Sequence, residues 1–215
     1  MKNTINLAFA VFVQTLRRLS SQPLGLALLS LPAALCDLAL ESLADTQTQP
    51  NYVVIFASFL GAWILTRMGA LATFEVASRS PGEVTVAQAF GSALRKLRLL
   101  VPVELLTGIW VILGILLVLP GIYFLTVFAF VPFLIAESKE SKPWLNYLIY
   151  SRALAKPVFW PLLLLTTVFF LLSLLSTLGD SGGWALKLLA TIVLTAVANV
   201  STVFFYQRVK ETLSR

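Results

Sequence analysis

A run of 32 uncharged residues decides the fold: it lies between the two glutamates of residues 104–137, ELLTGIWVILGILLVLPGIYFLTVFAFVPFLIAE. As a single helix this run would be roughly 48 Å long, whereas the hydrocarbon core of a bilayer is about 30 Å thick. Cations lie on both flanks, at positions 95–98 and 139–142. Since both ends lie beside positive charge, the run is expected to cross the bilayer twice. The sequence therefore predicts a helical hairpin whose turn is Pro120-Gly121, with a second break at Val131-Pro132.

The composition of the whole chain is that of a polytopic membrane protein. Of its 215 residues, 58% are hydrophobic and only 12% are charged, and the mean hydropathy is +0.88; soluble domains carry about twice that share of charge. The chain has one cysteine and no histidine. Zinc-type cysteine patterns, HExxH metalloprotease chemistry and serine–histidine–aspartate triads are therefore excluded. We expect no metal site, no cofactor and no enzymatic activity.

The order of apolar and polar segments predicts an all-α integral membrane protein. Six transmembrane helices are expected as three hairpins, each preceded by an amphipathic helix on the cytoplasmic surface. The amphipathic helices are expected at 3–19, after a capping box formed by Thr85 and Gln88, and at 143–156. The spans are expected at 24–43 and 52–77, within 99–136, and at 158–178 and 184–206.

The cations sort to one side of this layout. Of the 16 Lys and Arg residues, 14 lie in the N-terminal segment, the 78–99 loop, the 137–157 loop and the C-terminal tail, whereas the opposite connections carry Asp45 and Asp180. The positive-inside rule then places both termini in the cytoplasm, and we expect the inner membrane of a bacterium. The basic residues are expected to meet anionic lipid headgroups rather than nucleic acid. The candidates for this contact are Arg17, Arg18, Arg95, Lys96, Arg98 and Lys156.

A weak internal repeat divides the single membrane domain, residues 1–215, into three copies at about 3–78, 83–137 and 141–209. In each copy cations near the end of the amphipathic helix are followed by a proline, at positions 23, 102 and 161. Copies two and three also share residues at a constant offset of 59, among them Ser92/Ser151 and Thr107/Thr166. The repeat predicts a pseudo-threefold arrangement of the hairpins.

The central 60 residues resemble a group of poorly characterised bacterial six-span membrane proteins, which includes the membrane domain fused to some glycerophosphodiester phosphodiesterases. The resemblance implies a six-span fold but no phosphodiesterase activity, because these 215 residues contain no hydrolase domain. Pro157 stands where that group commonly has glycine. The residues that carry the resemblance are Leu119-Pro120-Gly121-Ile122-Tyr123, Pro132, Glu137, Ser151, Leu154, Lys156 and Trp160.

Charged residues within the apolar runs are the strongest functional candidates, because each costs about 2.5–3.5 kcal/mol to insert into a bilayer. Asp37 and Arg67 fall at heights that differ by only about 5 Å along their helices. We therefore predict an ion pair between them, with Glu41 one turn from Asp37. The pair is either a structural clamp or a polar site for a headgroup, ion or proton; alternatively, Arg67 snorkels alone. Glu104 is expected near the headgroups, beside Arg98 or a surface helix. Glu75 and Arg79 are four residues apart and are expected to form an ion pair at the membrane interface.

A polar stripe also follows the last span, at Lys187, Thr191, Thr195, Asn199 and Thr202. Such a stripe marks either a packing seam with interhelical hydrogen bonds or the lining of a substrate path.

These observations favour a non-catalytic membrane protein that binds lipid or a partner protein, as a scaffold, anchor or accessory subunit. Its expected partners are membrane lipids, anionic headgroups on the cytoplasmic side, and another membrane protein or a second copy of the chain. The alternative is a small-solute or lipid transporter with a polar site around Asp37 and Arg67. A dry interior would favour the first function, and water-accessible volume at mid-membrane would favour the second.

Overall fold

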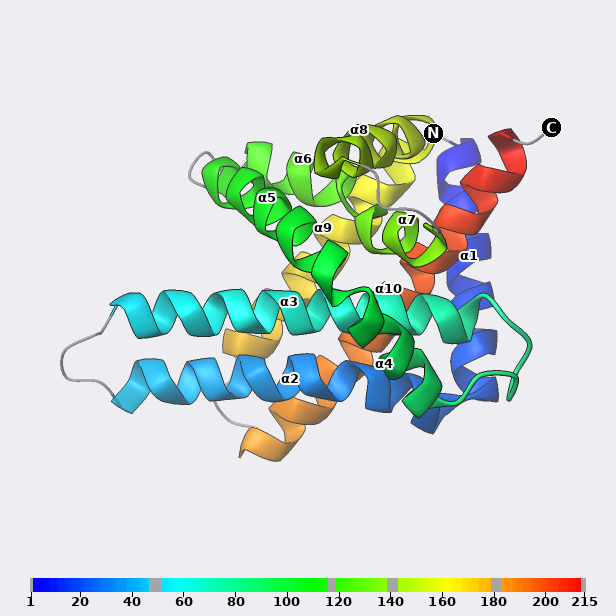
Figure 1. Cartoon of the computed structure of the whole chain (residues 1–215). Coiled ribbons are helices and arrows are strands. Elements are labelled where there is room, and N and C mark those ends of the chain that lie inside the picture. Colours follow the sequence, from blue (N-terminus) through cyan, green and yellow to red (C-terminus); the bar gives the residue numbers. More distant parts are fainter. Residues whose placement is uncertain (1, 47–51, 116–118, 139–142, 179–182, 214–215) are drawn as a thin grey trace.

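The computed structural model describes residues 2–46, 52–115, 119–138, 143–178 and 183–213, and every regular element among them is helical. The elements are α1 (Lys2–Ser21), α2 (Pro23–Thr46), α3 (Tyr52–Ala77), α4 (Val86–Arg95), α5 (Leu97–Ile115), α6 (Leu119–Val127), α7 (Val131–Glu137), α8 (Trp144–Ala155), the 3₁₀ turn η1 (Lys156–Val158), α9 (Phe159–Leu178) and α10 (Gly183–Leu213). α2 and α3 form an antiparallel pair, and α1 packs against α10 near the two ends of the chain (Figure 1).

Four stretches of the described residues are long and apolar enough to cross a membrane. They are Ala57–Ala77, Pro120–Glu137, Trp144–Phe169 and Ala185–Leu213. A fifth arises if Phe9–Ser21 and Pro23–Cys36, which meet at 101°, are counted as one bent span. A right angle is also the geometry of a helix that lies along a membrane surface before a helix that crosses it. The fold is therefore all-helical with four to five candidate spans, and the prediction of six spans and a threefold repeat stays a prediction.

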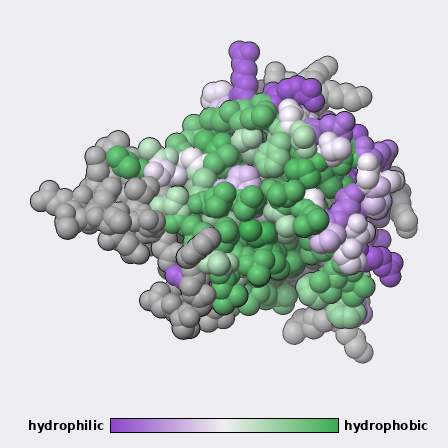
Figure 2. Space-filling view, turned by 90° about the horizontal axis from the view of Figure 1, so that it is seen from below, coloured by the Kyte–Doolittle hydropathy of each residue, from purple (hydrophilic) through white to green (hydrophobic). Residues whose placement is uncertain are grey.

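The outer surface is apolar over a wide area. Figure 2 shows a broad hydrophobic face, with hydrophilic residues along its right-hand and upper edges. Large apolar side chains are exposed on α1, α2, α5, α8, α9 and α10. Soluble monomers rarely expose continuous apolar surface of this kind, so the face is suited to contact with lipid.

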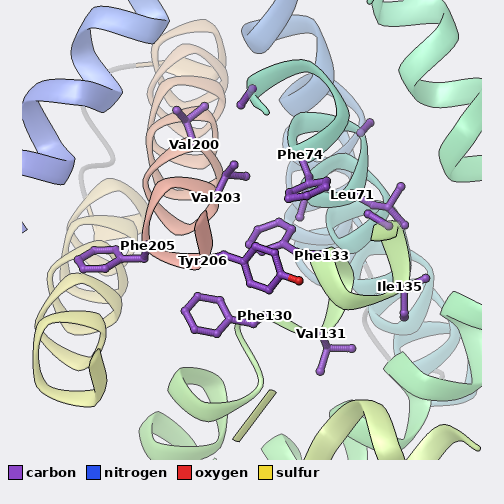
Figure 3. Close-up of a cluster of buried hydrophobic side chains, with 14 of the residues drawn as sticks. Leu71, Phe74, Phe130, Val131, Phe133, Ile135, Val200, Val203, Phe205 and Tyr206 are labelled. Carbon is purple, nitrogen blue, oxygen red and sulfur yellow. The ribbon is translucent and has the colours of Figure 1, made fainter. Parts of the chain in front are cut away.

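The interior is packed with aromatic side chains from α3, α7 and α10. Phe74 stacks on Phe133 with ring centroids 5.4 Å apart, and Tyr206 meets both rings edge-on at 5.6–5.8 Å (Figure 3). Phe130, at the start of α7, contacts Tyr206 from another side at 5.5 Å. Aromatic packing thus joins three helices that are distant in sequence.

The central hairpin differs from its predicted form at the turn. α6 begins at Leu119, so Pro120-Gly121 lies in its first turn and the prediction that this dipeptide forms the turn is wrong. Proline is tolerated there because the first turn of a helix does not use its backbone N–H groups. The connection falls at 116–118, outside the described residues, as do most of the connections expected at 44–51 and 179–183. The second break is confirmed, since α6 ends at Val127 and α7 begins at Val131.

Local interactions in the 75–95 region agree with their predictions. Glu75 and Arg79 form an ion pair at 3.1 Å. Thr85 Oγ1 accepts a hydrogen bond from the Gln88 amide, and Gln88 Oε1 accepts one from the Thr85 amide, so the capping box is confirmed. α4 follows with Ala89 and Ala93 buried.

Replacement of Thr85 by alanine is expected to destabilise α4 by about 1 kcal/mol, because an N-cap hydroxyl is lost. Thr85→Ser keeps the hydroxyl and is expected to have little effect. Hydrogen exchange of the amides in the first turn of α4 measures the difference directly. Equal exchange rates in the two variants would show that the capping box contributes nothing to the helix.

Candidate functional site

The buried charges of the structure meet around Arg67, in the middle of α3. Arg67 Nε lies 2.9 Å from Glu104 Oε2 of α5, and its Nη2 donates to the carbonyl of Phe128 at 3.2 Å. Trp63, one turn earlier on α3, donates from Nε1 to the same carboxylate oxygen at 3.3 Å, and its ring lies 5.3 Å below the guanidinium. The Glu104 side chain is completely buried and that of Arg67 is 17% exposed. A single cation therefore connects α3, α5 and the chain after α6.

Arg67 also binds a backbone carbonyl at the break between α6 and α7. Because α6 ends at Val127, its last carbonyls have no helical partner, and backbone groups in an apolar interior must find another donor. Ser151 Oγ of α8 donates to the Val127 carbonyl at 2.7 Å. Arg67 donates to the next carbonyl, that of Phe128, which also accepts from the Val131 backbone N–H. The positive guanidinium also suits the negative end of the helix dipole. The break between α6 and α7 is thus stabilised by side chains of two other helices.

This geometry changes the predicted role of Glu104. The expectation that Glu104 meets Arg98 or a surface helix is wrong, because Glu104 binds Arg67 of α3 while Arg98 is exposed. Its position near the headgroups stays a prediction. α5 begins at Leu97, so Glu104 lies about 10 Å from its end, and Arg67 lies about 15 Å from the end of α3. These two distances differ by about 5 Å, as do the expected heights of Asp37 and Arg67, so height alone does not choose between the two carboxylates. The side chains of Asp37 and Glu41 lie outside the described residues, so an Asp37–Arg67 pair stays a prediction.

The polar stripe of α10 is half-buried. Thr191, Thr195 and Asn199 are partly covered, and Thr202 Oγ1 donates to the Ala198 carbonyl one turn back. Next to the stripe, Ser201 shares a hydrogen bond of 3.0 Å with Thr15 of α1. Within the described part of the chain, five buried side-chain atoms have no hydrogen-bond partner: Arg18 Nε, Gln22 Oε1, Thr73 Oγ1, Glu104 Oε1 and, on the stripe itself, Asn199 Nδ2.

Basic segments that are far apart in sequence gather at one end of the molecule, where cations bind the last carbonyls of helices. Arg18 donates to the carbonyl of Val76, in the last turn of α3, and to that of Arg79, which follows α3. Lys96 donates to the carbonyls of Ile135 and Ala136 in α7. Burial lowers the pKa of Lys96, while the nearby Glu75 and Glu137 carboxylates act to raise it.

At the same end of the molecule, the carboxylate of Glu137 binds Lys210 and Tyr206, each at 2.7 Å. Arg18 and Lys96, both candidates for lipid contact, therefore have partners within the chain. The other candidates are exposed: Arg17, Arg95, Arg98 and Lys156.

Three cavities lie away from the Arg67–Glu104 pair. One of about 590 Å³ lies between Glu75, Glu137 and Lys210 at the basic end, and a smaller one of about 260 Å³ lies beside α4. A third, of about 560 Å³, lies between α6, α8 and α9. Neither Arg67 nor Glu104 lines any of the three. Among the described residues no three carboxylate or cysteine groups come together as a metal site would require.

No protein-family model, curated protein or solved structure matches this chain. The function is therefore inferred from the geometry of its own residues.

Proposed function

We propose that the chain is a non-catalytic polytopic protein of a bacterial inner membrane, which binds lipid and serves as a scaffold, anchor or accessory subunit. One observation carries this proposal: the inward-facing cations Arg67, Arg18 and Lys96 bind carbonyls and a carboxylate of the chain itself, while a broad apolar face is left outside. Charges used in this way hold helices together. The family resemblance in the central 60 residues points to the same class of membrane protein.

The first helix supports a role at the membrane surface. Val11 and Thr15 of α1 are buried, with Thr15 hydrogen-bonded to α10, whereas Phe9, Phe12 and Leu16 are exposed. The apolar stripe of α1 therefore faces away from the protein, as in a helix whose apolar side is immersed among lipid headgroups. Arg17 is exposed on the same helix and can reach phosphate groups.

Native mass spectrometry of the gently extracted protein tests this function. We expect the chain to retain lipid molecules, a second protein, or a second copy of itself, and to lose them in a harsher detergent. A bare monomer after the mildest extraction would contradict the proposal. The masses retained would also give the identity and stoichiometry of what is bound.

A transporter is the second candidate, and the broken helix favours it. Transporters place binding sites at interrupted membrane helices, and here the break between α6 and α7 lies beside Glu104, whose Oε1 has no partner among the described residues. Thr107, also buried on α5, tests this alternative. In a Cys36→Ser background, Thr107→Cys is expected to resist a water-soluble maleimide if the interior is dry. Rapid labelling would favour the transporter.

A further inference from the structure

The cavity between α6, α8 and α9 combines positive charge with aromatic side chains. Its wall includes Tyr123 of α6, Ile149 and Arg152 of α8, Lys156 of η1 and Trp160 of α9. Its volume of about 560 Å³ is within the range of small-molecule sites. Arg152, Lys156 and Trp160 are all exposed, so a ligand can enter from outside the bundle.

The two cations of this cavity differ from the inward-facing cations of the chain. Arg152 and Lys156 are four residues apart where α8 passes into η1, so they lie one turn apart on one face. In the part of the chain that the structure describes, the side chain of neither residue takes part in a hydrogen bond or an ion pair. Arg18, Lys96 and Lys210, in contrast, each bind an acceptor of the protein. Arg152 and Lys156 are therefore available to an anion from outside, and a phosphate accepts such charge-assisted bonds well.

An apolar wall begins beside the cations. The rings of Tyr123 and Phe159 lie 5.7 Å apart, and those of Phe159 and Trp160 lie 5.5 Å apart. Tyrosine and tryptophan with one exposed side are typical of the boundary between lipid headgroups and hydrocarbon.

A ridge of exposed apolar side chains then continues along α9. Its members are Trp160, Leu164, Val168 and Leu171, which are 70%, 51%, 44% and 50% exposed. Their spacing of four, four and three residues keeps them on one side of the helix. From Trp160 to Leu171 the ridge rises about 16 Å, close to the half-thickness of about 15 Å of a bilayer core. The ridge thus has the length of one acyl chain and begins at the two cations.

We propose that this cavity binds one anionic glycerophospholipid. Arg152 and Lys156 hold the phosphate, Tyr123 and Trp160 flank the glycerol region, and an acyl chain lies along Leu164, Val168 and Leu171. Inorganic phosphate would satisfy the cations but leave the ridge uncovered, so the whole surface fits a phospholipid better than a soluble anion. The inference rests on the proposed function, because it requires this face of α9 to lie in lipid.

Titration of the purified full-length chain with lipids, followed by native mass spectrometry, tests the site. Phosphatidylglycerol and phosphatidylcholine with identical acyl chains are compared. We expect the wild type to retain one phosphatidylglycerol with about tenfold preference: both lipids present a phosphate to Arg152 and Lys156, but only phosphatidylcholine also brings a choline cation, which these two cations repel. The double variant Arg152→Gln/Lys156→Gln should lose that preference. Arg208→Gln is the matched control: it removes an exposed cation, paired with Glu211 at 3.6 Å, far from the cavity along the chain. Its preference should equal that of the wild type.

Three results would overturn the site: an unchanged preference in the double variant, an equal loss in Arg208→Gln, or displacement of the lipid by millimolar inorganic phosphate. If the double variant does not fold, Trp160→Ala and Leu164→Ala replace it, because both side chains are exposed. Each should weaken retention of both lipids several-fold, and unchanged retention would count against the site. If the wild type and the variants retain lipid equally, this site is wrong but the proposed function stands. If the wild type retains no lipid, the proposed role as a lipid-binding protein is wrong as well.

Discussion

Replacement of Arg67 by leucine is expected to destabilise the protein by about 3–5 kcal/mol, the cost of leaving a buried charge without its partner. Glu104 is completely buried, and Arg67 is its cationic partner at 2.9 Å. The substitution also removes one of the two donors to the Phe128 carbonyl at the break after α6, and the Val131 backbone N–H remains as the other. Because Arg67 joins three segments of the chain, the loss should appear as global rather than local unfolding.

The free energy of unfolding of the purified protein in mixed detergent micelles measures this effect. Arg79→Leu is a matched control, because Arg79 also pairs with a glutamate at 3.1 Å but its side chain is 52% exposed. An exposed pair contributes about 0–1 kcal/mol. The double variant Arg67→Leu/Glu104→Leu should recover much of the loss, since replacing both buried charges removes the unpaired carboxylate. Similar losses of unfolding free energy for Arg67→Leu and Arg79→Leu would show that the buried Arg67–Glu104 pair does not hold the helices together.

The parts of the structure that follow from local sequence were predicted correctly. α3 has the bounds expected from its apolar run, Tyr52–Ala77. The Thr85–Gln88 capping box and the Glu75–Arg79 pair each depend on residues three or four positions apart, and both are present. In such cases the chemistry that decides the structure lies within one helical turn.

The parts that depend on distant segments could not be predicted in the same way. Arg18 binds carbonyls 58 and 61 residues further along the chain, and Ser151 binds the carbonyl of Val127. Every residue has the same backbone carbonyl, so the sequence alone does not indicate which carbonyls lack a helical hydrogen-bond donor at a helix end. The Arg67–Glu104 pair lies between these two cases. Both charges stand out in the sequence, but nothing in the sequence indicates that Glu104 rather than Asp37 approaches Arg67, and the expected span began within two residues of the start of α5.

The turn of the central hairpin illustrates a related difficulty, since a Pro-Gly pair is typical of both a turn and the start of a helix. The local pattern does not distinguish the two; the approach of the neighbouring helix does. A Cβ atom placed on Gly114 of α5 would lie 2.7 Å from the backbone nitrogen of Gly121 and 2.8 Å from its Cα. Gly114 therefore lets the backbone of α6 approach α5 closely at Gly121, which lies within a helix rather than in a turn.

Gly114→Ala is therefore expected to destabilise the protein by about 1–3 kcal/mol, the usual cost of overpacking, because the clash is with backbone atoms that cannot rotate away. The Cβ would also lie 2.8 Å from the Phe124 ring. Gly61→Ala is the matched control: Gly61 is likewise within a helix, and a Cβ there meets no atom within 4 Å. Alanine at that position should be neutral or stabilise the helix by about 0.5–1 kcal/mol. The two variants, compared by thermal unfolding in the same detergent, should therefore shift the midpoint in opposite directions or by clearly different amounts. Equal midpoints would mean that α5 and α6 do not pack through Gly114 and Gly121, and the central hairpin would then need a different geometry.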